Sequence, residues 1–540
     1  MFRFSHRLEH QDIRMFTIVL IAILYAVFLS FFSIRAHLGL QTQMNDLGNA
    51  DQAIWAASEG DWSMPQSNNL DGQIHSRLGM HANLLFLPLS LLYHLWPDPR
   101  ILLILSSMAC SLGSIGLYKI ASHRLGPIGW SLVPPLAFLC SPLVHTANLY
   151  DFHIITIATA FIIWAIYSFW IGNNIRAWIF LIFALLCKED IPLITAMYGI
   201  ITLMYGNRRR GIIIIVISLL YLIAVLGLLV PVMNKGEWTS NINGANDRYS
   251  WIIRTPGKIL PTIARPDRLR LLLYFLLSGA IAAWKGRRWL LLLIPSIFYG
   301  LFSDMVWMTR LTGTYYWITA EAVIIIACLE ASRGSLTAMK KSRPWPLIYL
   351  STATILFSFL FSPLPHGVWA SWDNYKVDDA YRSLEEIQKR IPIDGTLSVQ
   401  NNLGAHLSHR PDIATIPRRS AKASHILIHL RYLGGPVSGL FVRTSPSFMY
   451  GLSLPQLLEV TQRLIQSPDW GIVEYCDGFY LFERNAEDRL DETEILDRFR
   501  SDSSNMVESY RSQSNNLSPL RPYIVSSLTW KQLFHPEFLK

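Results

Sequence analysis

The feature that most constrains this chain is a series of apolar runs, most of them near the length needed to cross a bilayer. Eleven runs are present, at 15–34, 101–118, 128–144, 154–171, 177–187, 191–205, 212–232, 271–283, 289–302, 314–329 and 346–361. A bilayer core about 30 Å thick requires roughly 20 apolar residues in a helix. Hydrophobic residues make up 51% of the 540 residues and charged residues only 16%, a balance typical of polytopic membrane proteins. We therefore expect an α-helical polytopic membrane protein with about 11 transmembrane helices plus interfacial helices.

Three simpler classes are excluded by the placement of charge and cysteine. The first run follows the basic segment 1–14 and lacks a small-residue cleavage pattern, which predicts an uncleaved helix instead of a signal peptide. The net charge of +9 does not indicate nucleic acid, because the basic residues cluster in short loops, where they fix orientation during insertion. The five cysteines have no paired spacing, so we expect neither a disulfide framework nor a thiolate metal site.

A shorter apolar run, 84–96, decides the predicted topology. It is interrupted by Pro88. If it does not cross the membrane, the basic loops that follow all fall on the side of the N-terminus, as the positive-inside rule requires. We therefore place this run as an interfacial or re-entrant helix on the outer face, within a first outer loop at 35–100. The N-terminus is then cytoplasmic, and the chain after Pro363 lies outside.

The composition after Pro363 is that of a soluble domain. Apolar positions at 381, 384, 387 and 391 follow helical spacing, 396–399 and 426–430 have the pattern of short strands, and 457–465 predicts an amphipathic helix. Segments 471–475 and 479–482 predict a β-hairpin that turns at Asp477 and Gly478. We expect a transmembrane domain at 1–363, a small α/β domain at 364–486 and a weakly patterned polar tail at 487–540.

Charged and histidine side chains from five segments share the predicted outer face. They are Asp46, His75, His81, Asp151, His153, Lys188, Glu189, Asp190 and Arg310. Run 177–187 is short, about 16 Å at helical rise, which places the three charges after it below the membrane surface. Charges at that depth are costly unless they line a wet cavity or have partners. Taken singly, each Asp is explained equally well as a helix cap, and Lys188 and Arg310 as partners of Glu189 or Asp304. Their convergence favours a functional site.

The residue types suggest distinct chemical roles. Asp46, Asp51 and Asp151 are the candidates for a catalytic general base. Lys188 and Arg310 suit a phosphate, and we assign Tyr315 to the same donor phosphate-binding group, with Glu189 and Asp190 in support. His81, Asp151 and His153 offer mixed nitrogen and oxygen ligands for a divalent metal ion such as Zn²⁺, Mn²⁺ or Mg²⁺, although their spacing matches no recognised metal motif.

The ordered motifs resemble those of a known family. They are DLGNADQAIW at 46–55, GMH at 79–81, SP at 141–142, YDFH at 150–153, KED at 188–190 and SVQNNLGAHLSHR at 398–410. Together they are similar to a domain-of-unknown-function family of bacterial and archaeal predicted multi-spanning membrane proteins. One departure is visible, because Tyr315 and Tyr316 stand where a His-Tyr pair is expected.

That family in turn resembles the C-type glycosyltransferases, which have the GT-C fold. The resemblance implies a GT-C-like transmembrane domain, a key acid in the first outer loop at Asp46, and a second acid at Asp151. It also implies a glycosyltransferase in the bacterial inner membrane, with membrane lipids and a polyprenyl-phosphate sugar donor as its partners. The alternative is a transporter or flippase, in which the same charges form a substrate or proton path. A non-catalytic scaffold explains the soluble domain but not the clustered charges.

Overall fold

The computed structural model describes residues 2–69, 72–234, 249–303, 306–311, 314–338, 344–368, 372–431, 452 and 454–515. The chain divides into two compact units. Unit 1 comprises Met1–Ser33, Ser76–Leu92 and Arg100–Ser371, and unit 2 comprises Ile34–His75, Tyr93–Pro99 and Trp372–Lys540. Unit 2 therefore takes in much of the predicted first outer loop, which the sequence-based division at 363 had grouped with the transmembrane domain.

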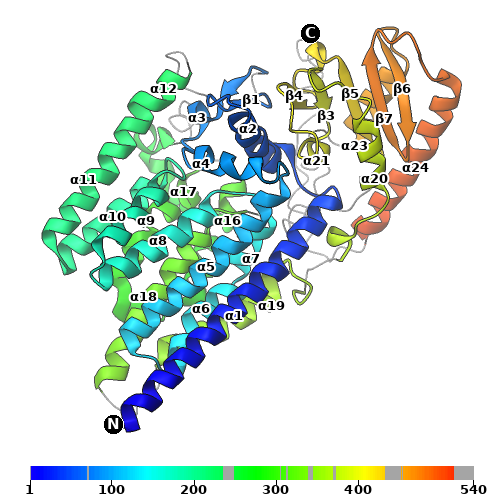
Figure 1. The fold of residues 1–540 in the computed structure, drawn as a ribbon. Coiled ribbons are helices and arrows are strands. Elements are labelled where there is room, and N and C mark those ends of the chain that lie inside the picture. The colour runs from blue at the N-terminus through cyan, green and yellow to red at the C-terminus, as the bar shows by residue number, and fades with distance from the viewer. Residues whose placement is uncertain are drawn as a thin grey trace. The chain divides into compact units, whose positions relative to one another are not determined.

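Unit 1 is built from helices (Figure 1). Most of α1 (Phe2–Leu38) belongs to it, and its other α-helices are α3 (Arg77–Met80), α4 (Phe86–Ser90), α5 (Arg100–Leu125), α6 (Val133–Cys140), α7 (Pro142–Leu149), α8 (Ile155–Trp170), α9 (Asn174–Leu185), α10 (Ile191–Tyr205), α11 (Arg208–Ala224), α12 (Val230–Met233), α14 (Trp251–Arg254), α15 (Ile259–Ile263), α16 (Pro266–Phe275), α17 (Ile294–Phe302), α18 (Ile318–Ala338) and α19 (Trp345–Phe361). Run 84–96 contains only the short α4 and a 3₁₀ turn, Leu91–His94, which together are too short to cross a bilayer.

The described residues contain three helices long and apolar enough to cross a membrane, Ile13–Leu38, Arg100–Leu125 and Arg208–Met233. A bent pair, Gly129–Cys140 with Pro142–Leu149, makes a fourth if it is counted as one span. Four further apolar helices, α8, α9, α10 and α19, are shorter. The predicted count of eleven is therefore not confirmed, because between 225 and 302 several apolar stretches form π or 3₁₀ turns in place of long α-helices.

Large apolar side chains are exposed on two of the helices long enough to cross a membrane. On α1, Phe16 and Val27 are exposed by 69% and 65%, and on α11, Ile223 is exposed by 65%. Such faces are unfavourable in water but match lipid tails, which are as apolar as leucine. On the inner side α10 and α11 pack closely, and a Cβ added at Gly211 would lie only 2.4 Å from the backbone nitrogen of Leu203.

The bend between α6 and α7 follows from the sequence Ser141-Pro142. Proline has no N–H to donate, which leaves a carbonyl of the preceding turn without its helical partner. That carbonyl, of Phe138, accepts from Ser141 N at 3.2 Å instead. Ser141 Oγ caps α7 by accepting from Leu143 N at 3.2 Å, and the Leu139 carbonyl, which loses Leu143 N as its helical partner, lies 2.7 Å from His145 Nε2. The helices meet at 43°, as in the broken helices that membrane proteins tolerate where side chains satisfy the backbone.

Unit 2 is organised around a five-stranded mixed sheet of strand order β4-β3-β5-β7-β6. Its strands are β3 (Leu397–Val399), β4 (Ile413–Thr415), β5 (His425–His429), β6 (Trp470–Cys476) and β7 (Phe479–Arg484), and its helices are α2 (Asn49–Ser58), α20 (Ala380–Gln388), α21 (Asn401–Gly404), α23 (Leu454–Ile465) and α24 (Glu492–Asn515). Two short strands, β1 (Pro65–Gln66) and β2 (His75–Ser76), lie in the first loop. The central strands β3 and β5 pair in parallel, and β5, β7 and β6 are antiparallel.

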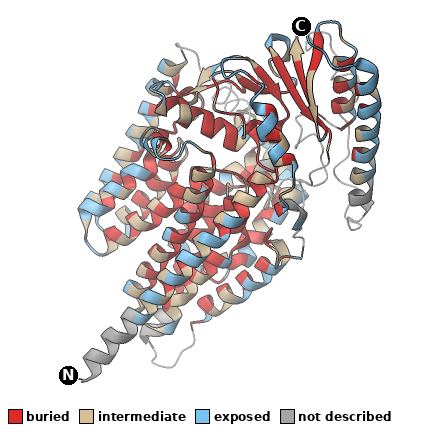
Figure 2. Cartoon of the chain, turned by 45° about the vertical axis from the view of Figure 1, so that its right-hand side comes forward, coloured by how far each residue is buried: buried red, intermediate tan, exposed pale blue. Residues whose placement is uncertain are grey.

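Both faces of this sheet are buried (Figure 2). Tyr480 and Phe482 of β7 pack into one apolar cluster with α23 and α24. The alternate residues Phe479 and Leu481 pack into the other cluster, with α20, α21 and the first-loop residue Met44. The predicted helix at 381–391, the strands at 396–399 and 426–430, the helix at 457–465 and the hairpin are all confirmed. At the hairpin turn Asp477 has φ 47° and Gly478 φ 80°, the conformation that an Asp-Gly turn supplies.

The polar tail predicted from 487 is wrong for residues up to 515. Helix α24 occupies Glu492–Asn515, and Ile495, Phe499 and Met506 are buried against the sheet. The Asp502 carboxylate accepts hydrogen bonds from the hydroxyls of Tyr475 and Tyr480 at 3.0 and 2.7 Å. The sequence pattern understated this helix because only a few residues of a long polar segment carry its packing. Residues 516–540 lie outside the described part of the chain.

First-loop side chains cover the outer edge of β4. The amide of Ile413 donates to Ser67 Oγ at 3.0 Å, and Ser67 Oγ donates back to the Ile413 carbonyl at 2.7 Å. Two residues on, the amide of Thr415 donates to Asn68 Oδ1 at 3.0 Å. An edge strand otherwise leaves these backbone groups unpaired. This hydrogen bonding explains why the first loop belongs to unit 2 and not to the helical unit.

Candidate functional site

A pocket in unit 1 brings together two of the charged residues that the sequence singled out, Lys188 and Asp190. The space between its walls is about 450 Å³, a volume that includes the part open to solvent. Its walls come from α8, α10, α17 and the segments around 188–190 and 308–319. The lining residues are Ile155, Lys188, Asp190, Ile194, Ser296, Tyr299, Met308, Tyr315, Tyr316, Trp317 and Thr319.

Lys188 is the cation of this pocket. Its side chain is only 15% exposed, and Nζ lies 3.5 Å from Asp190 Oδ2. The same Nζ lies 5.8 Å from the ring centroids of both Tyr315 and Tyr316, a distance at which an aromatic face attracts a cation. The long ion pair and two ring faces hold the ammonium group without saturating its three donors.

Asp190 is incompletely satisfied. It occupies the N-cap position of α10, but its side chain makes no capping hydrogen bond, so the cap interpretation does not hold for it. Within the described residues, Asp190 Oδ1 is buried with no hydrogen-bond partner. A buried acceptor left in this way costs free energy, and a hydroxyl bound in the pocket would relieve that cost.

Glu189 faces another partner and fixes the loop in place. Its Oε1 lies 2.8 Å from His81 Nδ1, and its Oε2 accepts from the amide of Ala82 at 3.1 Å. The neighbouring Asn83 donates to the carbonyl of Cys187 at 2.7 Å. These bonds tie segment 81–83 to segment 187–189 and so hold in place the backbone that carries Lys188 and leads into Asp190. The predicted supporting role of Glu189 agrees with these contacts and stays a prediction.

The histidines do not form the predicted metal site. Within the described ranges, no group of three or more His, Cys, Asp or Glu residues is arranged to hold a metal ion. His81 Nδ1 faces Glu189, and the His153 ring stacks on Tyr315 with ring centroids 3.3 Å apart. Asp151 is buried and has φ 55°, the left-handed conformation that Asp tolerates better than most residues. In the described residues these three side chains therefore do not meet as a ligand set.

Asp46 and Asp51 both belong to unit 2 and differ in their surroundings. Asp46 lies in a π-helical turn, Met44–Gly48, and is half-buried. Asp51, on α2, is fully buried. Asp51 Oδ1 accepts from Tyr93 Oη at 2.5 Å, and Oδ2 accepts from Ser408 Oγ at 2.6 Å.

Asp51 also forms an ion pair with a histidine. His409 Nε2 lies 2.9 Å from Asp51 Oδ2, and the His409 ring stacks on Trp55 at 5.6 Å. Burial alone would lower the pKa of His409, but the adjacent Asp51 carboxylate outweighs it and raises that pKa above its ordinary value. Because both Asp51 oxygens are engaged and shielded from solvent, we assign Asp51 to the architecture of unit 2 and keep Asp46 as the candidate base of the first loop.

Arg310 is half-buried, and its carbonyl accepts from Trp317 Nε1 at 2.5 Å. Asp304, the predicted partner of Arg310, lies outside the described residues. The tyrosines Tyr299 and Tyr316 line the pocket and were missed by the sequence analysis. The adjacent pair at 315–316 was the only signal for Tyr316, and nothing marked Tyr299 among the aromatic residues of its apolar run.

The family model described as "Predicted membrane protein (DUF2079)" matches residues 36–433. The chain belongs to this family. The match spans all the motifs on which the resemblance rested, and it confirms that resemblance. A comparison with curated proteins finds no match. Among solved structures, the crystal structure of ArnT from Cupriavidus metallidurans in the apo state is similar, with a TM-score of 0.45 and 10% identity, over 86% of this chain and 97% of that chain.

Proposed function

We propose that this membrane protein is a glycosyltransferase that takes a sugar from a polyprenyl-phosphate donor and transfers it to an envelope acceptor at the outer face of the inner membrane. The observation that supports the proposal is the buried Lys188, held over two tyrosine rings in a pocket with an unsatisfied carboxylate oxygen. The donor class comes from the sequence resemblance to C-type glycosyltransferases.

The pocket chemistry suits a sugar joined to a phosphate. Aromatic faces such as Tyr315 pack against the apolar face of a sugar ring, and Asp190 Oδ1 accepts a sugar hydroxyl. Lys188 contacts the phosphate as a point charge. When the bond between the anomeric carbon and the phosphate oxygen breaks, negative charge grows on the leaving polyprenyl phosphate, and a fixed cation stabilises that charge most where water is excluded.

A general base completes the reaction. The acceptor hydroxyl attacks the anomeric carbon and loses its proton to a carboxylate, a step worth roughly 10²- to 10⁴-fold in rate. We assign this role to Asp46, with Asp151 as the second candidate. In Asp46→Asn the amide keeps the size of the side chain but cannot take a proton, so turnover should be abolished while donor binding stays intact.

Purified protein incubated with a panel of polyprenyl-phosphate sugars should release free polyprenyl phosphate and glycosylate an acceptor. Lys188→Ala should weaken donor use strongly, and Lys188→Arg partly, because the charge survives but the geometry changes. Lys285, exposed and outside the pocket, provides the matched control Lys285→Ala, which should behave as wild type.

The transporter alternative predicts a different result. A flippase would move the lipid-linked sugar between leaflets of a vesicle without breaking the sugar–phosphate bond. Intact donor that crosses the bilayer, with no release of lipid phosphate from any member of the panel, would replace the transferase with the transporter.

A further inference from the structure

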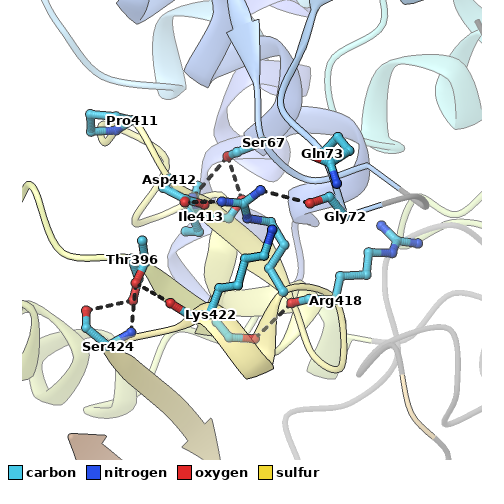
Figure 3. A network of polar contacts seen from close by, with 12 residues as sticks. Ser67, Gly72, Gln73, Thr396, Pro411, Asp412, Ile413, Arg418, Lys422 and Ser424 are labelled. Atoms are coloured by element: carbon cyan, nitrogen blue, oxygen red, sulfur yellow. Dashed lines mark hydrogen bonds and ion pairs between the residues drawn. The ribbon is translucent and has the colours of Figure 1, made fainter. Parts of the chain in front are cut away.

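A basic turn follows β4 in unit 2. It contains Arg418, Arg419 and Lys422 between Pro417 and the start of β5. Figure 3 shows this turn beside the first-loop residues Ser67, Gly72 and Gln73. Three cations within five residues repel one another unless each has a partner, so the partners decide what the turn does.

Arg419 has its charge compensated. Its guanidinium forms an ion pair with Asp412 and donates to the carbonyl of Gly72 at 2.8 Å. These contacts fasten the first loop to the sheet, and they leave the carboxylate of Asp412 committed to Arg419. Arg419 therefore serves the architecture of the turn.

Arg418 is held differently. Its Nη1 donates to two amide oxygens, Asn45 Oδ1 at 3.0 Å and Asn68 Oδ1 at 3.1 Å. The amides are themselves fixed, since Asn68 Nδ2 donates to Asn45 Oδ1 at 2.9 Å and Asn68 Oδ1 accepts from the amide of Thr415. Neutral oxygens orient the guanidinium without neutralising it. In Figure 3 the Arg418 side chain extends away from the hydrogen bonds drawn around Asp412 and Thr396.

Arg418 has no carboxylate partner in the part of the chain that the structure describes, and Nη1 is the only one of its guanidinium nitrogens with a hydrogen bond there. Burial lowers the pKa of Arg418, as expected for a cation that faces neutral oxygens. The remaining edge, Nε and Nη2, is the pair of parallel donors that grips two oxygens of a phosphate or carboxylate. Lys422 is exposed, and among the described residues it forms no ion pair, so it adds a second positive charge.

We propose that Arg418, oriented by Asn45 and Asn68 and assisted by Lys422, forms an anion site in unit 2 that binds a phosphate group through the Nε and Nη2 edge. Asn45 directly precedes Asp46 in the chain, so the anion is held by the same turn that carries the proposed base. The site does not depend on glycosyl transfer, because binding of a phosphate can be measured without turnover.

The test uses the full chain in lipid nanodiscs and two probes, inorganic phosphate and polyprenyl phosphate incorporated in the disc, followed by ³¹P NMR titration. Arg418→Gln should weaken phosphate binding about tenfold or more, since it removes a charge-assisted bidentate contact, and Arg418→Lys should fall between. Arg382, exposed on α20, provides the control Arg382→Gln, which should bind as wild type. Loss with both probes identifies a site for any phosphate, and loss with polyprenyl phosphate alone identifies a lipid-linked ligand; each result supports the site.

A second variant tests the site in case Arg418→Gln does not fold. Asn45→Asp places a carboxylate where an amide oxygen now contacts Arg418 at 3.0 Å, so it should keep the fold and its melting temperature while abolishing phosphate binding. Wild-type affinity for both probes in a folded Asn45→Asp or Arg418→Gln protein would overturn the proposal.

Discussion

Replacing Asp51 separates a structural carboxylate from a catalytic one. Asp51→Ala removes the acceptor for the hydroxyls of Tyr93 and Ser408 and the anion that faces His409. In the structural interpretation the change removes contacts between α2 and the rest of unit 2 and makes local unfolding of α2 easier. In a catalytic interpretation it would stop turnover and leave α2 as stable as before.

The size of the effect follows from the contacts. Each hydroxyl left buried without an acceptor costs about 1 kcal/mol or more, and an ion pair broken at a buried site costs about 3 to 5 kcal/mol in full. His409 is 30% exposed, so water solvates the ring after the ion pair is broken and reduces that cost. A total of about 4 kcal/mol corresponds to roughly a thousandfold change in the opening equilibrium of α2. Asp51→Asn, which keeps one oxygen, should lose about half of that.

Hydrogen exchange of the full chain, followed in peptides that cover Asn49–Ser58, reports this local opening. Asp51→Ala should exchange about a thousandfold faster there, and Asp61→Ala, the same change at an exposed aspartate, should stay within a few-fold of wild type. Unchanged protection of α2 in Asp51→Ala, with turnover lost, would refute the structural assignment and return Asp51 to the candidate bases.

The raised pKa of His409 gives the same network a pH dependence. A group whose pKa is higher in the folded than in the unfolded state stabilises the fold fully below its unfolded pKa, about 6.5, and loses that contribution as pH rises through the folded value. The opening free energy of α2 should therefore fall as pH rises above about 6.5. Burial lowers the pKa values of His425 and His429, which acts in the opposite direction. The contribution of His409 is therefore the difference between the pH slopes of the α2 opening free energy in wild type and in His409→Gln. A slope identical in the two proteins would contradict the assignment.

Three further outcomes are expected. Glu330, whose side chain is 2% exposed and bonded by two arginines at 2.5 to 3.0 Å, should on change to Gln lower the melting temperature in detergent, at a cost of about 3 to 5 kcal/mol. A cysteine at Ser420 should be labelled from outside the cell and one at Gly206 should not; the reverse pattern would invert the predicted topology. Glu189→Gln should destabilise the protein more than Asp190→Asn does, because only the Glu189 carboxylate has both oxygens bonded; equal melting temperatures would contradict this reasoning.

The soluble fold was largely predictable because its elements are local and periodic. Strand β5 is a short apolar run, α23 has apolar residues at helical spacing, and the hairpin turns at an Asp-Gly pair. Strand β4, Ile413–Thr415, was not predicted. Its stability as an edge depends on Ser67 and Asn68, which lie more than three hundred residues earlier in the chain.

The helical unit was predictable in class but not in detail. Apolar composition identifies segments that favour lipid, yet it does not distinguish a long α-helix from the π turn at Leu276–Ala280 or the 3₁₀ segment Trp284–Leu293. Among the predicted site residues, the cluster at 188–190 drew attention because charge in an apolar context is rare, and the structure places Lys188 and Asp190 in the wall of a pocket; their role stays a prediction. The partners of Glu189 and Asp190 were not predicted, because they depend on the tertiary structure. Glu189 faces His81, and Asp190 faces the pocket.

The carboxylates of unit 1 differ in how far protein donors satisfy them, and among the described residues Glu321 Oε2 and Asp190 Oδ1 are both buried without a hydrogen-bond partner. Glu330 and Glu189 each have both oxygens engaged by protein donors, so this fold is able to satisfy a buried acid fully. Asp190 has one oxygen at 3.5 Å from Lys188 and the other without a donor in the described residues. A purely structural ion pair gains nothing from that geometry and loses the free energy of an unsatisfied acceptor. A donor that enters the pocket would recover this loss, which is the reason that the proposed function gives Asp190 a substrate hydroxyl and Lys188 the donor phosphate.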